Sequence, residues 1–100
     1  MPSLKVSVAH ELGQEVAAER LKRLLEGVKA QYADKLSNLE EEWDDFTGRF
    51  KISAMGIKSE GTVAIEETEV RVDGKIPLAA MIFKGRIEET IRSYLAKILA

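Results

Sequence analysis

The chain has 100 residues, of which 45% are hydrophobic, enough for one domain with one core. Its 15 Lys and Arg and 17 Asp and Glu residues are well mixed and leave a net charge of −2. No basic stripe is present to hold a nucleic-acid backbone, so we expect no nucleic-acid partner. The absence of cysteine excludes disulfides, thiolate metal sites and cysteine nucleophiles. We therefore predict a single domain over residues 1–100.

Neither the start of the sequence nor its longest apolar run indicates a membrane protein. Residues Met1–Lys5 lack the apolar core of a signal peptide. The run Pro77–Phe83 is too short to cross a bilayer. We therefore expect a cytoplasmic protein without a transmembrane segment.

The first half of the chain contains one strand pattern and one helix pattern. Alternating apolar residues from Leu4 to Val8 predict a strand that ends near His10, followed by a corner at Leu12–Gly13. Apolar residues at three- and four-residue steps predict a helix from Gln14 to Ser37. The alternation in Leu39–Trp43 indicates a short extra strand.

The middle of the chain reads as three consecutive strands, each with one apolar and one charged face. They cover Phe46–Ala54, Ile57–Ile65 and Val70–Ile76, with turns at Met55–Gly56 and Glu66–Thr68. Glycines at positions 48, 56, 61 and 74 lie in or beside these strands and indicate a curled sheet.

Pro77 suits the start of a last helix, which the apolar spacing predicts from Leu78 to Leu99. The element order is then β-α-β-β-β-α, and the fold class is α+β. The apolar face of the sheet must be buried against something. We predict a curled antiparallel sheet of about four strands with two helices packed on one face.

His10 is the only histidine in the chain. Histidine is the residue type that proteins most often use as a general base or metal ligand, so His10 is a candidate for either role. No GxSxG, HExxH, GxGxxG or GxxxxGK[ST] pattern accompanies it. A structural histidine that closes the first strand is therefore favoured, and we predict no catalytic residues, no cofactor and no enzyme activity.

The acidic run Glu40–Asp45 offers oxygen ligands for a hard cation, but it lacks the spacing and central glycine of a calcium loop. It favours a solvated surface, and we predict no metal site. Trp43 within this run is a core residue or an interface anchor, since nothing basic surrounds it to hold a nucleic acid.

The segment Pro77–Phe83 is more apolar than burial on one sheet requires, because a helical turn has about 3.6 residues. Two interpretations stay open. Either the helix start is buried on two sides under the first helix, or it forms a docking patch for a subunit, a lipid-like surface or a hydrophobic polymer. The candidate patch residues are Leu78, Met81, Ile82 and Phe83.

Three blocks of sequence resemble the polyhydroxyalkanoic acid system proteins, a small bacterial family linked to polyhydroxyalkanoate storage granules. The blocks are His10–Gly13 with Ala17, Phe50–Ile57 followed by Gly61-Thr62-Val63, and Lys75–Leu78 continuing through Phe83–Glu89 and Ile91. The resemblance implies a non-catalytic accessory or regulatory role, with polyhydroxyalkanoate granules or granule proteins as partners. It supplies no active-site residues.

Two functional hypotheses follow. The first is an interaction module, as a homodimer, that associates with granules through the candidate patch; with a net charge of −2, adsorption would depend on apolar area and hardly on salt. The alternative is a binder of small hydrophobic ligands, because a curled sheet around a long final helix resembles helix-grip folds.

Overall fold

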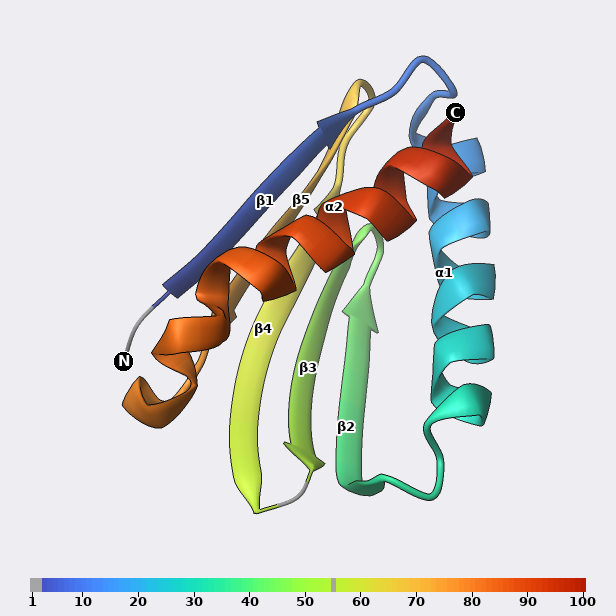
Figure 1. Ribbon diagram of the computed structural model, residues 1–100. Coiled ribbons are helices and arrows are strands. Elements are labelled where there is room, and N and C mark those ends of the chain that lie inside the picture. The colour runs from blue at the N-terminus through green and yellow to red at the C-terminus, as the bar shows by residue number, and fades with distance from the viewer. Residues whose placement is uncertain (1–2, 55) are drawn as a thin grey trace.

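The computed structural model describes residues 3–54 and 56–100 and shows a layer of two helices against one sheet (Figure 1). The elements in chain order are β1 (Ser3–Ala9), α1 (Gln14–Gln31), β2 (Leu36–Asp44), β3 (Thr47–Ala54), β4 (Ile57–Ile65), β5 (Glu69–Lys75), the 3-10 helix η1 (Leu78–Phe83) and α2 (Lys84–Leu99). The predicted α+β class is confirmed.

Five strands form one antiparallel sheet in the order β1-β5-β4-β3-β2. The sheet has five strands where about four were predicted, because the short extra strand indicated at Leu39–Trp43 is a full strand, Leu36–Asp44, that pairs with β3. For the same reason α1 ends at Gln31 and not at Ser37. A tight turn after Asp44 places Asp44 opposite Thr47, with Asp45 at a φ of 52°. Hydrogen bonds to β3 pair the backbone N–H and C=O groups that a longer α1 would have paired within the helix.

The core lies between the sheet and both helices, so the prediction of two helices on one face is confirmed. The period of two in each strand sends alternate side chains to this inner face. They meet small and branched residues of the first half of α1 and the last turns of α2. The buried cluster consists of Val6, Ala17, Ala18, Leu21, Val63, Ile65, Val70, Leu95 and Leu99.

Two glycines allow close packing within the sheet. A Cβ on Gly48 would lie 2.9 Å from the rings of both Trp43 and Phe50, which pack edge to face at 5.9 Å. A Cβ on Gly61 would lie 2.8 Å from the carbonyl oxygen of Asp73 on the neighbouring strand. The predicted Met55–Gly56 turn includes Met55, which is outside the described residues; Gly56 itself has a φ of 79°.

The final helix begins later than predicted. Residues Leu78–Phe83 form the 3-10 helix η1, and the α-helix α2 starts only at Lys84. No residue of η1 is buried. The interpretation that this segment is buried on two sides under the first helix is therefore wrong, since α1 ends far from it and contacts the other end of α2.

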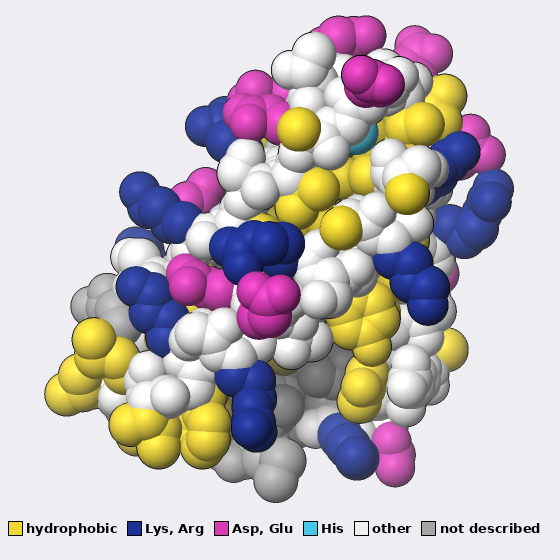
Figure 2. Space-filling model, turned by 45° about the horizontal axis from the view of Figure 1, so that its top comes forward, with side chains coloured by type: hydrophobic (Ala, Val, Ile, Leu, Met, Phe, Trp, Pro, Cys, Tyr) yellow, Lys and Arg dark blue, Asp and Glu magenta, His cyan; other side chains and the backbone are white. Residues whose placement is uncertain are grey.

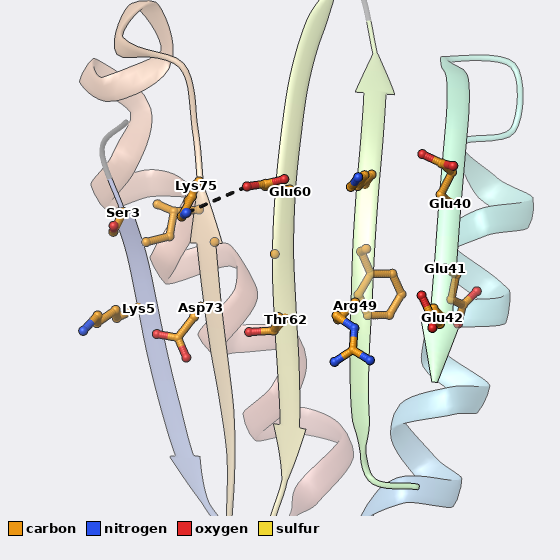
Figure 3. A pocket seen from close by; sticks show the side chains of 15 residues that line it. Ser3, Lys5, Glu40, Glu41, Glu42, Arg49, Glu60, Thr62, Asp73 and Lys75 are labelled. Carbon is orange, nitrogen blue, oxygen red and sulfur yellow. Dashed lines mark ion pairs between the residues drawn. The ribbon is translucent and has the colours of Figure 1, made fainter. Parts of the chain in front are cut away.

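The outer face of the sheet, away from the helices, carries charged side chains in rows that cross the strands (Figure 3). In one row Lys5 is opposite Asp73, and Arg49 is opposite Glu42. At the β1 edge, the backbone amide of Lys5 donates a 3.0 Å hydrogen bond to Glu88 of α2. Within the described part of the chain, neither helix has the length and apolar character needed to cross a bilayer.

Candidate functional site

The apolar patch, formed by Leu78, Met81, Ile82 and Phe83, is exposed to solvent. The exposed fractions are 74%, 48%, 84% and 50%, respectively. Among the described residues, these are four of the eight large hydrophobic side chains that are exposed, and the other four are spread over the chain. Figure 2 shows the patch as a hydrophobic cluster that projects at the lower left. The sequence therefore identified a real surface feature.

Local geometry explains why the patch is not buried. Pro77 is extended, with a ψ of 152°, and so turns the chain out of β5. A 3-10 helix has three residues per turn, so consecutive residues of η1 point in three directions around its axis. With apolar side chains on all sides, η1 cannot bury them against one neighbour. Burial of a large apolar side chain is favourable by about 1.5–3 kcal/mol, so burial of the patch against a partner would be favourable by several kcal/mol.

His10 has a structural environment. It is 6% exposed, and its Nε2 lies 3.0 Å from the carbonyl oxygen of Glu66, while its Nδ1 accepts a 3.2 Å hydrogen bond from the amide of Leu12. These contacts require the tautomer with the proton on Nε2. The side chain therefore joins the end of β1 to the β4–β5 turn and uses both ring nitrogens in doing so.

Trp43 is half-buried on the inner face of β2, beside an ionic cluster that the sequence analysis missed. Its indole nitrogen donates to Glu41 at 2.6 Å, and the ammonium of Lys29 contacts Glu41 at 2.7 Å. Lys29 also pairs with Glu26 at 2.7 Å, and Lys22 lies 4.7 Å from the indole centroid. The sequence does indicate that Glu41 lies beside Trp43, because Leu39, Glu41 and Trp43 are alternate residues of one strand and so share one face of the sheet.

This cluster shifts two pKa values. Burial by itself would raise the pKa of Glu41, but the hydrogen bonds from Lys29 and Trp43 outweigh it and hold that pKa below its ordinary value. Hydrogen bonds to Glu26 and Glu41 raise the pKa of Lys29. The cluster attaches the second half of α1 to the edge of the sheet. Its cation, Lys29, forms ion pairs with both Glu26 and Glu41.

The acidic run Glu40–Asp45 is divided by the sheet. Glu40, Glu42 and Asp44 belong to the outer face, whereas Glu41 is inside with Trp43. Among the residues that the structure describes, no group of three or more acidic or histidine side chains is arranged to hold a metal ion. Figure 3 shows Glu40 and Glu42 beside cationic side chains of the same face.

A hollow of about 740 Å³ crosses the outer face of the sheet. Nine of its 15 lining residues are charged, of both signs, and Lys75 approaches Glu60 at 3.9 Å (Figure 3). The hollow is open and lies on the side of the sheet opposite the helices. It is therefore not the enclosed space between sheet and final helix that a helix-grip ligand site requires.

The model of a protein family described as "putative polyhydroxyalkanoic acid system protein" matches residues 4–99. The chain belongs to this family. The match confirms the resemblance and spans every element from β1 to α2, the apolar patch included. Comparisons with curated proteins and with solved structures gave no significant match. Membership of the polyhydroxyalkanoic acid system family thus links this chain to polyhydroxyalkanoate.

Proposed function

We propose that this protein is a non-catalytic accessory of polyhydroxyalkanoate storage granules, located in the cytoplasm, that binds the granule or its proteins through the apolar patch. The observation that carries this function is the exposure of Leu78 and Ile82, at 74% and 84%, in a protein of the polyhydroxyalkanoic acid system family. Large exposed apolar clusters on small proteins mark interaction sites.

The position of the patch suits binding to an extended surface. It is held between β5 and α2, and α2 packs on β1 and on the core through Leu95 and Leu99. The patch is therefore anchored at both of its ends, by β5 and by α2. Transfer of apolar area from water at about 25 cal/mol per Å² drives such docking.

Other described features support an accessory role over a catalytic one. Both nitrogens of His10 are engaged by backbone groups, so this side chain has no free nitrogen to act as a general base. The charges of Glu41 and Lys29 neutralise each other on the inner face. The proposal that the protein is not an enzyme depends on these contacts. The small-ligand alternative stays a prediction, and the 740 Å³ hollow does not favour it, because that hollow lies on the face of the sheet away from the helices.

A homodimer also stays a prediction. A stable protein interface buries about 800 Å² on each partner, more than the six residues of η1 supply alone. Dimerisation through the patch would need neighbouring surface as well. Sedimentation equilibrium of the wild-type protein, compared with a patch variant, measures this directly.

Co-sedimentation with purified granules tests the proposed function. We expect Leu78→Ser combined with Ile82→Ser to reduce the bound fraction at least about fivefold, because both side chains are exposed and contribute to binding but not to folding. The control is Val16→Ser, which removes another exposed apolar side chain, 42% exposed, from the first turn of α1. Equal pelleting of wild type and the double variant would contradict the proposal.

A further inference from the structure

Acidic side chains are concentrated at one end of the molecule. The strands and helices run along the long axis, so the turns collect at two opposite poles (Figure 1). The pole away from η1 contains the β1–α1, β2–β3 and β4–β5 connections. Its acidic side chains are Glu11, Glu15, Asp44, Asp45, Glu66, Glu67 and Glu69.

At the pole that carries the apolar patch, cationic side chains lie next to η1, and the sheet also holds Glu40 and Glu60 at this end. Lys84 follows Phe83 directly, and Arg86 lies in the same first turn of α2. Lys58 is the second residue of β4 at this end, and Lys75 ends β5 three residues before the start of η1. In Figure 2, acidic side chains gather at the top of the molecule, while cationic ones lie beside the projecting patch.

Three of these cations are free to meet an external anion. Among the described residues, no carboxylate lies within 4.0 Å of Lys58, Lys84 or Arg86, whereas Arg23, Lys29 and Arg71 all have such partners. The next acidic residues along α2 are already engaged. Glu88 accepts from the amide of Lys5, and Glu89 pairs with Arg92 at 2.9 Å.

We propose that the apolar patch and the cations around it form one docking surface for an anionic lipid layer, with η1 among the headgroups and Lys58, Lys84 and Arg86 against their negative charges. Apolar side chains flanked by Lys and Arg are the composition that binds membrane interfaces. The acidic opposite pole is repelled by the same layer and so fixes the orientation. This proposal rests on the proposed function, because it assigns a partner chemistry to the same patch.

The charges change the salt dependence expected from net charge alone. A net charge of −2 predicts no electrostatic attraction to an anionic surface. Lys84 and Arg86 nevertheless follow Phe83 by one and three residues, so they lie within a Debye length, about 8 Å at physiological salt, of a layer that η1 enters. Each such residue is expected to contribute roughly fivefold to binding near an anionic surface.

Vesicle flotation with the full-length protein tests the inference. One set of vesicles is phosphatidylcholine alone, and the other is equimolar phosphatidylglycerol and phosphatidylcholine. We expect binding to the anionic set only, at least about 20-fold weaker for Lys84→Glu combined with Arg86→Glu, and weaker in 1 M salt, where the Debye length is about 3 Å.

The matched control is Arg23→Glu combined with Lys97→Glu, which makes the same change in net charge on exposed positions away from η1. It should bind anionic vesicles as the wild type does. Equal binding to both vesicle sets, an equal loss in the control, or no vesicle binding at all would overturn the inference. If the protein pellets with granules but does not bind anionic vesicles, the proposed function stands and the lipid-binding inference is wrong. If it binds anionic vesicles but does not pellet with granules, the lipid-binding inference stands and the proposed function is wrong.

Discussion

The indole nitrogen of Trp43 donates a 2.6 Å hydrogen bond to Glu41, two residues earlier on the same face of β2. This contact holds a carboxylate on the inner face of the sheet, where Lys29 of α1 reaches it from the other side. The pair therefore connects the sheet edge to the second half of α1, a region with few buried apolar residues.

Glu41→Gln should destabilise the protein by about 1–2 kcal/mol, because Lys29 loses a charge-assisted hydrogen bond at a partly buried site. Urea unfolding followed by the fluorescence of Trp43, the only tryptophan, measures this. Lys29→Met provides the second edge of a double-mutant cycle. Additive effects of the two substitutions would show that the contact has no energetic role.

The pH dependence of stability follows from the same contact. The pKa of Glu41 is lower in the folded chain than its ordinary value of 4.5, so the unfolded chain binds its proton first. Its stabilising contribution is fully present above about pH 4.5 and is lost as pH falls through the lower folded value. Lys29 has a raised pKa, so its contribution is present below 10.5 and is lost as pH rises further. Acid unfolding curves of wild type and Glu41→Gln should converge at low pH; parallel curves would contradict this.

Gly61→Ala should destabilise the sheet by about 1–3 kcal/mol, because the added methyl would lie 2.8 Å from a backbone oxygen of β5 that cannot move alone. Gly27→Ala is the matched control. Nothing lies within 4 Å of its added Cβ, and Ala is preferred to Gly in a helix by roughly 0.5–1 kcal/mol. The two substitutions should therefore change the urea midpoint in opposite directions.

His10→Ala should cost about 2–3 kcal/mol, since it leaves the amide of Leu12 and the carbonyl of Glu66 without their partner. Granule binding, measured below the unfolding midpoint, should not change. His10→Gln restores a donor for Glu66 and should recover part of the lost stability. Loss of function without loss of stability would instead assign His10 a chemical role.

The double variant Leu78→Ser and Ile82→Ser should change the free energy of unfolding by less than about 0.5 kcal/mol, because both side chains are exposed in the folded chain. Thermal unfolding compared with the Val16→Ser control checks this. A large destabilisation would mean that η1 is covered by another part of the protein in solution.

Much of the fold followed from hydrophobic periodicity, and the exceptions have local causes. The period of two identified β1, β3, β4 and β5 because each has a clean apolar face. The predicted first helix was too long because Tyr32 and Leu36 continue its three- and four-residue spacing. The pairing of β2 with β3 decided that region, and local sequence does not reveal such a contact. Strand β2 was underestimated because Glu41 interrupts its apolar face.

The candidate site was predictable in part. The apolar run Leu78–Phe83 was too dense for one buried helix face, which identified the patch before its exposure was known. Lys84 and Arg86 follow the patch in the sequence, but their proximity to the end of the sheet that carries Lys58 was not predictable, because only the topology brings these elements to one end. Net charge, an average over the whole chain, conceals this arrangement.

The bond between the amide of Lys5 and Glu88 occupies a backbone donor at one border of the sheet, where an additional strand would have to pair. The other border is β2, whose Glu40, Glu42 and Asp44 repel the same strand of another molecule. Edge-to-edge pairing between the sheets of two molecules, which would lead to fibres, is therefore opposed at both edges of the sheet.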